Sequence, residues 1–306
     1  MRRGASVDLI LAATILIWAF NVTVTRYVLT HGFRPLAYGA VRYAAAALLA
    51  VGVAVVLERS LRVGGRRVLM LIGIAAAFLL VNQISFVYSL KLTTATTVSL
   101  IMGTTPIFAA IVSSILGVER LTRPFWIATA IGFGGVALVA LGSGGGLSSD
   151  LGGDLLAISL SASWACYSVV IAPLMRRYSP YRISAVVLCV MCVPFLGISA
   201  PQLGEQNYGS LSTLTWFCLA YAIVGPLFLT NLLWFTAVHR VGAARATLFA
   251  NVQPFVAAVF AYVILSEHLH WLQVVGGLTI LAGILLERRW RQPVVPVEEQ
   301  PVESPL

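Results

Sequence analysis

The sequence predicts an all-α membrane protein with ten transmembrane helices, built as an inverted repeat of five plus five helices. Hydrophobic residues make up 59% of the 306 residues, and charged residues only 10%, whereas a soluble domain is about one-quarter charged. The apolar residues gather in runs close to the length of about 20 that spans a bilayer. The second half of the chain also repeats the pattern of the first.

Ten apolar segments follow one another with short connections. They cover residues 8–29, 36–57, 67–89, 94–117, 124–142, 154–173, 181–200, 212–238, 243–265 and 271–288. The first segment is too long for a signal peptide and lacks a convincing cleavage site before Arg26. We therefore interpret it as the first span, and the ten spans leave no room for a soluble domain.

Positive charge is divided unevenly between the two sides of these spans. Cytoplasmic loops of membrane proteins carry an excess of Lys and Arg. If the N-terminus is inside, fifteen basic residues lie on the inner side, and only Arg34 and Lys91 lie in outer loops. The remaining three, Arg26, Arg42 and Arg245, lie within spans. We therefore expect both termini to be cytoplasmic.

The chain divides into two repeats, a linker and a tail. We expect the first five-helix repeat at residues 1–142, an outer linker at 143–153, the second repeat at 154–290 and a cytoplasmic tail at 291–306. The linker is rich in Gly and Ser. The tail is rich in Pro and Glu and has no helical apolar period, which predicts disorder.

A shift of the sequence by 148 residues superimposes the ends of the two halves without a gap. The matched pairs include Pro106 with Pro254, Glu119 with Glu267, and Gly135 with Gly283. A shift of 146 residues places Trp18 on Trp164. Because five is odd, the second repeat must enter the membrane from the opposite face. Inverted repeats of this kind are typical of secondary transporters, whose binding site lies at the repeat interface.

Two sets of residues resemble a known family. The arginine motif of this family resembles a set formed by Pro35, Arg42, Tyr43 and Ala46. Its repeated signature is resembled by residues 95–106 with Glu119, Leu121 and Gly135, and by residues 243–254 with Glu267, Leu269 and Gly283. Over residues 8–289 the chain is thus similar to EamA-type permeases of the drug/metabolite transporter superfamily. The resemblance implies a ten-helix bacterial inner-membrane (plasma-membrane) permease, most similar to exporters of amino acids, including aromatic ones. The seventh span has no counterpart of Arg42.

Polar and aromatic side chains within the spans recur at helical spacing, which predicts a partly hydrated path. The candidate substrate-binding residues are Trp18, Asn21, Arg42, Phe78, Asn82, Phe86, Ser99, Trp164, Tyr167, Trp234 and Asn251. We expect a cavity between spans 1, 3, 4, 6, 8 and 9, in which amides and hydroxyls bind a polar head and aromatic rings enclose an apolar part. The alternative is that these side chains only join neighbouring helices or lie at the membrane interface.

Three further features have both a functional and a structural interpretation. Three roles are open for Arg42, namely contact with a substrate carboxylate, pairing with the carbonyl end of another helix, and extension to the membrane interface. Pro106 and Pro254 are expected in the middle of their spans, where a kink acts either as a hinge or as a fixed bend. Glu119 and Glu267 are expected to cap free helix amides.

The residues that the spans lack narrow the range of functions. No Asp or Glu lies near mid-membrane, which disfavours proton-driven export of quaternary cations, and no cluster of Lys and Arg suits phosphate. The basic residues lie in small groups between spans, so no nucleic-acid binding is expected. The pair Cys189 and Cys192 forms a single CxxC, and no metal, cofactor or catalytic set is expected.

We therefore expect a secondary transporter, and not an enzyme, that exports aromatic or other neutral amino acids or related small metabolites by alternating access. Its partners would be a small-molecule substrate and the lipid bilayer. The alternatives are a multidrug exporter of the same superfamily and a non-transporting membrane enzyme or assembly factor. Proton antiport and facilitated diffusion both stay open at this point, as does the oligomeric state.

Overall fold

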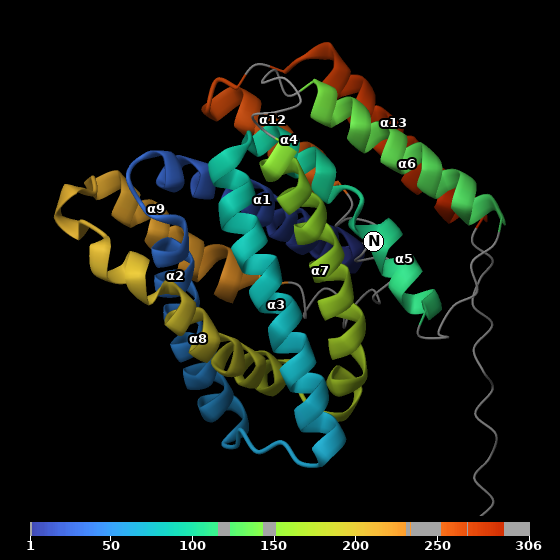
Figure 1. Ribbon diagram of the computed structural model, residues 1–306. Helices are drawn as coiled ribbons and strands as arrows, with labels where there is room; N and C mark the ends of the chain where they lie inside the picture. The colour runs from blue at the N-terminus through green and yellow to red at the C-terminus, as the bar shows by residue number, and fades with distance from the viewer. Residues whose placement is uncertain are drawn as a thin grey trace, which may run out of the picture.

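The computed structural model describes residues 2–115, 123–142, 151–230, 233, 252–267 and 269–290. Within these ranges every regular element is a helix (Figure 1). They are α1 (Arg2–Thr30), α2 (Pro35–Glu58), α3 (Arg66–Leu92), α4 (Ala95–Met102), α5 (Thr105–Ile115), α6 (Arg123–Leu141), α7 (Leu151–Arg177), α8 (Pro180–Glu205), the 3₁₀ turn η1 (Tyr208–Ser210), α9 (Thr213–Ile223), the π-helical η2 (Val224–Leu229), α12 (Gln253–Ile264) and α13 (Trp271–Trp290). Among the residues described, five helices are long and apolar enough to cross a membrane, namely α1, α2, α3, α7 and α8.

The predicted linker and tail are only partly described. Residues 143–150 and 291–306 lie outside the described residues. α7 begins at Leu151, so the last three residues of the linker expected at 143–153 are helical. Asp154 lies in the first turn of α7, where a carboxylate favours the positive end of the helix dipole.

The fourth predicted span consists of two helices, α4 and α5. α4 ends before Gly103 and Thr104, whose N–H groups each bond three residues back at 3.0 Å, and α5 begins at the next residue. Pro106 is therefore the second residue of a new helix, and the expectation that it lies in the middle of a continuous helix is wrong. Proline lacks an N–H and crowds the preceding turn, so a helix restarts more easily at it than it continues through it.

The start of α12 in the second half of the chain matches the start of α5 in the first half. The carbonyl of Thr104 accepts hydrogen bonds from the third and fourth residues after it, at 2.9 and 3.3 Å. The carbonyl of Val252, which lies 148 residues later, does the same, at 3.2 Å in both cases. Pro254 lies in the first turn of α12, as Pro106 does in α5. The two halves therefore share their backbone hydrogen bonds at the start of these two helices, and Pro254, like Pro106, lies at the start of a helix where the middle of a span was expected.

Glycines bring the last helices of the two halves, α6 and α13, into close contact, and the two helices run side by side (Figure 1). A Cβ atom at Gly135 would lie 2.6 Å from the carbonyl oxygen of Gly276, and one at Gly283 would lie 2.8 Å from that of Ala128. Larger side chains do not fit at these distances, and small residues allow such close approach of membrane helices. Gly135 and Gly283 are one of the matched pairs of the repeat.

α2 packs against its repeat counterpart α8, and an ion pair joins the two helices at each end. Arg182 Nε lies 3.0 Å from a carboxylate oxygen of Glu58, the last residue of α2. At the other end, Arg34 pairs with Glu205, the last residue of α8. Glu205 lies 147 residues after Glu58, and Arg182 lies 148 residues after Arg34. These pairs, named here the Glu58 clasp and the Glu205 clasp, are therefore related by the repeat.

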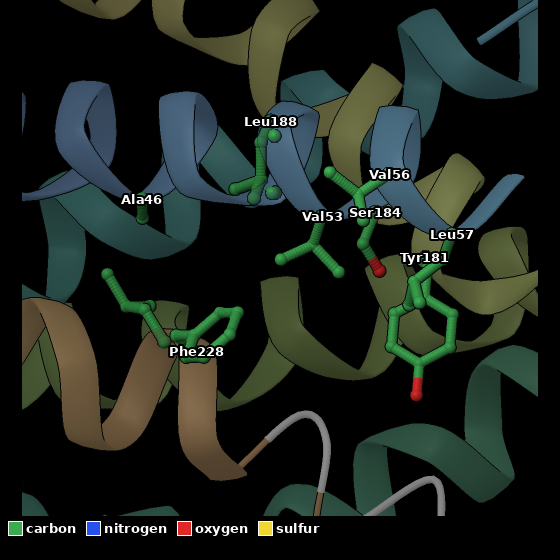
Figure 2. Close-up of a pocket in the computed structure, with 11 residues that line it drawn as sticks. Ala46, Val53, Val56, Leu57, Tyr181, Ser184, Leu188 and Phe228 are labelled. Atoms are coloured by element: carbon green, nitrogen blue, oxygen red, sulfur yellow. The ribbon is translucent and has the colours of Figure 1, made fainter. Parts of the chain in front are cut away.

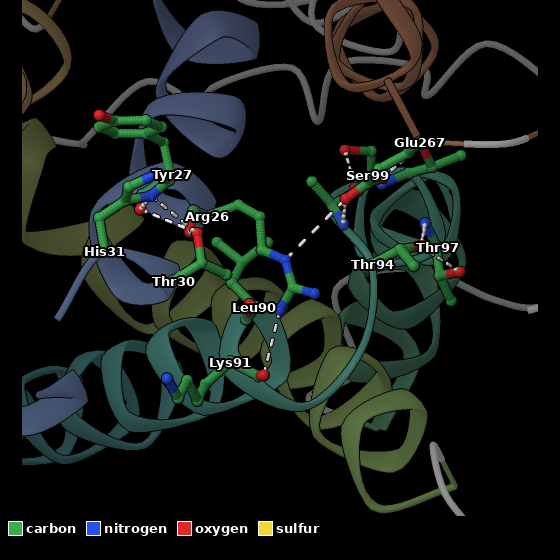
Figure 3. Close-up of polar contacts among 12 residues, drawn as sticks. Arg26, Tyr27, Thr30, His31, Leu90, Lys91, Thr94, Thr97, Ser99 and Glu267 are labelled. Atoms are coloured by element: carbon green, nitrogen blue, oxygen red, sulfur yellow. Dashed lines mark hydrogen bonds and ion pairs between the residues drawn. The ribbon is translucent and has the colours of Figure 1, made fainter. Parts of the chain in front are cut away.

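A carboxylate from the second half caps a helix of the first half (Figure 3). Glu267, between α12 and α13, accepts hydrogen bonds from the amides of Ala95 at 3.0 Å and Thr96 at 2.9 Å, at the start of α4. Arg26 Nε lies 3.9 Å from the same carboxylate. The capping role predicted for Glu267 is confirmed. Glu119 lies outside the described residues.

Two apolar clusters form the core. One includes residues of α1, α2, α3, α4, α7 and α12, and the other involves α2, α3, α7 and α8. α2, α3 and α7 contribute to both clusters, and so these three helices form the centre of the described bundle. The candidate site lies where α3 meets α2 and α7.

Candidate functional site

Arg42 points from α2 into the interior of the bundle, where it is only 2% exposed. Its Nη2 donates a hydrogen bond to Gln83 Oε1 at 2.8 Å. Three aromatic rings surround the guanidinium, with centroids 5.1 to 5.3 Å from Cζ; they belong to Tyr38, Tyr43 and Phe86. Ring faces stabilise a cation that has lost its water. Arg42 therefore does not extend to the membrane interface, one of the three possibilities that the sequence leaves open.

A chain of hydrogen bonds continues from Arg42 to the second half of the protein. Gln83 Nε2 donates to Asn82 Oδ1 at 2.7 Å, and Asn82 Nδ2 donates to the carbonyl oxygen of Leu160 at 2.9 Å. Leu160 belongs to α7, the first helix of the second half. This set, the Arg42 network, consists of Arg42, Gln83, Asn82 and the Leu160 carbonyl, and it joins α2 and α3 to α7 at the interface of the repeats.

The Arg42 network leaves much of the guanidinium without a partner. Nε and Nη1 of Arg42 are buried and have no hydrogen-bond acceptor among the described residues. No carboxylate in the described part of the chain lies within 4.0 Å of this guanidinium. Moving an unpaired ion out of water costs several kcal/mol. The surroundings of Arg42 are therefore suited to an anionic group.

Trp18 contacts the second half at the π-helical segment η2. Its Nε1 donates to the carbonyl oxygen of Pro226 at 3.3 Å. Pro226 lacks an N–H and so interrupts the regular ladder of helix hydrogen bonds, and π-helical turns are frequent at functional sites. The amide oxygen of Asn21, in the same helix as Trp18, is buried without a partner among the described residues. Both predicted residues of α1 thus place polar atoms inside the bundle.

Three further predicted aromatic residues lie on α3 and α7. Phe86 is buried and its ring faces Arg42. Phe78 lies two helical turns earlier on α3 and is half-buried. Tyr167 packs against the cluster of α2, α3, α7 and α8, which contains Tyr43. Of the three, the structure places Phe86 directly in the site.

The structure does not bring the remaining predicted residues to Arg42. Ser99 is fully buried, and its hydroxyl donates to the Ala95 carbonyl of its own helix at 2.6 Å. Trp164 is 42% exposed on α7 and contacts the ring of Tyr167. Trp234 and Asn251 lie outside the described residues.

Three neighbours of Arg42 are missing from the predicted binding set, namely Tyr38, Tyr43 and Gln83. Tyr38 lies four residues before Arg42, a spacing that places both side chains on one face of a helix. Gln83 follows the predicted residue Asn82 directly. These spacings were available in the sequence. The direction in which Arg42 points, which decides their relevance, depends on packing between helices.

A cavity of about 420 Å³ lies beside α2, between this helix, the start of α8 and η2 (Figure 2). Its lining side chains are apolar except for Tyr181 and Ser184. On α2 the lining begins at Ala46, one helical turn beyond Arg42, and follows one face of the helix to Leu57. None of the predicted binding residues lines this cavity, which involves spans 2, 7 and 8 and thus differs from the expected cavity.

Comparison with known proteins identifies two matching segments. Residues 5–141 and 151–287 each match the EamA-like transporter family. The chain is 25% identical over 276 residues to YdeK of Bacillus subtilis, an uncharacterised transporter, a match that covers 90% of this chain and 94% of YdeK. The uncharacterised transporter YyaM of the same species is 24% identical, with 67% of each chain covered.

A third relative has a more specific name. A probable terminal-alkyne amino-acid exporter of Streptantibioticus cattleyicolor is 24% identical over 196 residues, which cover 63% of this chain and 64% of that protein. One solved structure matches with a TM-score of 0.63 at 18% identity, covering 95% of this chain and 99% of the other. This last likeness concerns the fold alone.

The two family matches divide the chain into two halves. The prediction of an all-helical membrane protein with a five-plus-five repeat is thereby confirmed. The chain is a multi-pass membrane protein and belongs to the EamA-like transporter family.

Proposed function

We propose that this protein is a secondary transporter that exports aromatic or other neutral amino acids, or related small metabolites, across the inner membrane of a bacterium. The observation that carries the proposal is the buried Arg42 network, enclosed by aromatic rings where the two repeats meet. Polar groups beside aromatic walls suit a small molecule with a charged head and an apolar body. The name of the Streptantibioticus cattleyicolor relative, a probable amino-acid exporter, agrees with this class of substrate.

Alternating access is the proposed mode of transport. Inverted repeats allow two related packings, each open to one side of the membrane. The break before Pro106, the first turn of α12 at Pro254 and the π-helical segment η2 are the proposed hinges, because proline and irregular turns weaken the backbone hydrogen bonds that resist bending. The two clasps hold α2 against α8 at both ends. We therefore place the movement at these hinges rather than between α2 and α8.

Weak or absent coupling to protons is part of the proposal. Coupling in membrane transporters usually uses a carboxylate inside the bilayer. The acidic residues Glu58, Asp154 and Glu205 lie in the first or last turn of their helices. An imposed pH gradient should change the initial rate of transport in liposomes by less than twofold. A rate that rises tenfold with the gradient would refute uncoupled transport.

Export of lipophilic cations is the competing function. Aromatic rings suit flat cations, but Arg42, which has no carboxylate within 4.0 Å among the described residues, repels them in a medium of low dielectric constant. This repulsion favours zwitterions and anions. Catalysis, metals and cofactors have no part in the proposed function, which agrees with a family of transporters.

The orientation of the chain is also proposed from its charges. Both termini would be cytoplasmic, because fifteen of the twenty basic residues would then lie on the inner side. A fluorescent protein fused to the C-terminus should fluoresce in a bacterial host, whereas a fused periplasmic phosphatase should be inactive. The opposite pair of results would reverse the orientation.

Uptake into liposomes tests the proposed function. Liposomes that contain the purified protein should accumulate labelled phenylalanine or tryptophan faster than empty liposomes. Labelled alanine, threonine and methionine test the wider class of neutral amino acids. If none of the five is transported, amino-acid export is refuted.

A further inference from the structure

We infer that Arg42 and the apolar cavity beside it form one binding site for molecules that join an ionised carboxylate to an apolar body. The inference rests on the proposed function and deepens it, because it names the chemical group that a substrate must carry. It also states that an amino group is not required for binding. Amino acids would then be one kind of cargo, and simple aromatic or aliphatic acids would bind as well.

The first argument concerns the donors of the guanidinium. Arginine presents five N–H groups in a planar fork. Nη2 has one N–H on the edge shared with Nε and another on the edge shared with Nη1, and Gln83 accepts a hydrogen bond from Nη2. Nε and Nη1 have no acceptor among the described residues. Whichever Nη2 hydrogen Gln83 takes, one two-donor edge of Arg42 then has no acceptor that meets hydrogen-bond geometry among the described residues. A carboxylate fits such an edge with both oxygens.

The second argument concerns the charge. The rings of Tyr38, Tyr43 and Phe86 shield the guanidinium from water, but they carry no net charge. In surroundings of low dielectric constant an opposite charge is attracted more strongly than in water. The Arg42 network contains no second basic residue. A single positive charge matches a carboxylate better than it matches a phosphate with two negative charges.

The third argument concerns the apolar cavity. Its lining on α2 starts at Ala46, four residues after Arg42, which is about 6 Å along the helix axis. The walls include Val53, Leu188 and Phe228 (Figure 2). Its volume of about 420 Å³ lies in the range of about 300–1,000 Å³ usual for small-molecule pockets. The apolar wall of the cavity therefore begins one helical turn from Arg42, on the same face of α2.

The enclosure of Arg42 indicates when the carboxylate binds. At 2% exposure the guanidinium is closed off from both sides of the membrane. An anion therefore reaches it in a conformation in which the contact of α2 with α3 has opened. Closure of the helices around the pair would then hold the carboxylate against the guanidinium.

Three small molecules with the same aromatic ring test the inference on the unchanged protein. L-Phenylalanine carries both charged groups, 3-phenylpropionate lacks the amine, and phenethylamine lacks the carboxylate. In thermal unfolding of the full chain in detergent, the first two should raise the melting temperature with increasing concentration, and phenethylamine should not. Equal stabilisation by phenethylamine and 3-phenylpropionate would overturn the inference without any variant being needed.

Variants assign the two parts of the site. Arg42→Gln should weaken binding of 3-phenylpropionate at least tenfold, because hydrogen bonds to charged groups are among the strongest. Arg66→Gln removes the same charge from an exposed position at the start of α3 and should leave binding unchanged. Ala50→Phe fills the cavity. It should weaken the binding of 3-phenylpropionate at least tenfold and leave the binding of butyrate unchanged. Unchanged binding in Arg42→Gln would overturn the role of the charge, and unchanged binding in Ala50→Phe would overturn the role of the cavity.

The failure of this inference can be told from the failure of the proposed function. Uptake of phenylalanine together with equal binding of phenethylamine would preserve amino-acid export and remove the carboxylate requirement. Binding of 3-phenylpropionate without uptake of any of the five amino acids would preserve the site and refute amino-acid export. Absence of both binding and uptake would refute both.

Discussion

α2 and α8 are repeat counterparts that pack against each other, and they are alike at their ends but different in their middles. Each begins with a proline in its first turn and ends with a glutamate that pairs with an arginine near the start of the other. In the middle, α2 buries Arg42. The residues 147 and 148 positions later in α8 are Cys189 and Val190, both exposed.

The ends of α2 and α8 therefore belong to the scaffold, whereas the middle of α2 belongs to the site. Symmetric halves need the same contacts at both ends of their shared helix pair, so the clasps are duplicated. A substrate with one carboxylate needs a single cationic partner for it, and a second buried arginine would only add a cost of several kcal/mol. The middle of the pair is therefore where the two repeats diverge.

Replacement of Arg42 should have the largest effect, because it removes the main difference between α2 and α8. Arg42→Leu is expected to lower amino-acid uptake at least tenfold, because the counter-charge of the substrate is lost. Thermal stability should stay equal or rise by about 1–4 kcal/mol, since an uncompensated buried charge is exchanged for an apolar side chain. Uptake into liposomes and thermal unfolding in detergent measure the two effects.

The matched control for this change is the counterpart position in α8. Cys189→Leu should leave both uptake and stability close to those of the unchanged protein, because Cys189 is exposed. Near-normal uptake by Arg42→Leu, or a strong loss of uptake in Cys189→Leu, would show that the site does not depend on the asymmetry between α2 and α8.

A second change supplies Arg42 with a counter-charge from the protein itself. Gln83→Glu places a carboxylate where an amide oxygen now lies 2.8 Å from Arg42 Nη2. The new pair should offset the loss of the hydrogen bond from Gln83 to Asn82, so that stability changes by less than about 1 kcal/mol, and it should lower the affinity for carboxylate substrates at least tenfold, since the substrate's partner is occupied. Melting temperature and binding of 3-phenylpropionate measure both effects. Tighter binding in this variant would contradict the account.

The Glu58 clasp should contribute more to stability than its counterpart. Glu58 and Arg182 are 14% and 23% exposed, and Ser179 also donates to this carboxylate. Glu58→Gln should therefore destabilise the protein by about 1–3 kcal/mol. Thermal unfolding at low and high salt measures the loss, which should depend only weakly on salt because the pair is largely buried.

The Glu205 clasp should give the smallest effect. Glu205 and Arg34 are 62% and 46% exposed, and exposed ion pairs contribute about 0–1 kcal/mol. Glu205→Gln should lower stability by less than about 1 kcal/mol, with a loss that disappears at high salt. A larger loss than that of Glu58→Gln would reverse the expected order of the two clasps.

Most of the fold could be predicted from the sequence because its signals are local. Apolar runs of spanning length mark the helices, and the matched glycines Gly135 and Gly283 mark the repeat. At Pro106 the sequence predicts a disturbed helix, but it does not predict that one helix ends and another begins there. Proline indicates that a helix is disturbed, but the choice between a kink and a complete break depends on Gly103 and Thr104 and on the helices packed around them.

The site could be predicted less completely, since it depends on which way side chains point. Asn82 and Phe86 were identified from their shared helical face, and both lie beside Arg42 or its hydrogen-bond partners. The direction of Arg42 itself could not be chosen from spacing, because an arginine near a helix end extends outward or inward according to its neighbours. Ser99 shows the opposite case, since its hydroxyl bonds within its own helix.

Uptake of labelled phenylalanine tests the central claim most directly, namely that a single buried charge in the first repeat recognises the substrate. Liposomes with the unchanged protein, with Arg42→Gln and with Arg34→Gln should be compared in one preparation at equal protein content. The account predicts that Arg42→Gln falls to the level of empty liposomes and that Arg34→Gln stays within twofold of the unchanged protein. Equal uptake by Arg42→Gln and the unchanged protein would contradict it.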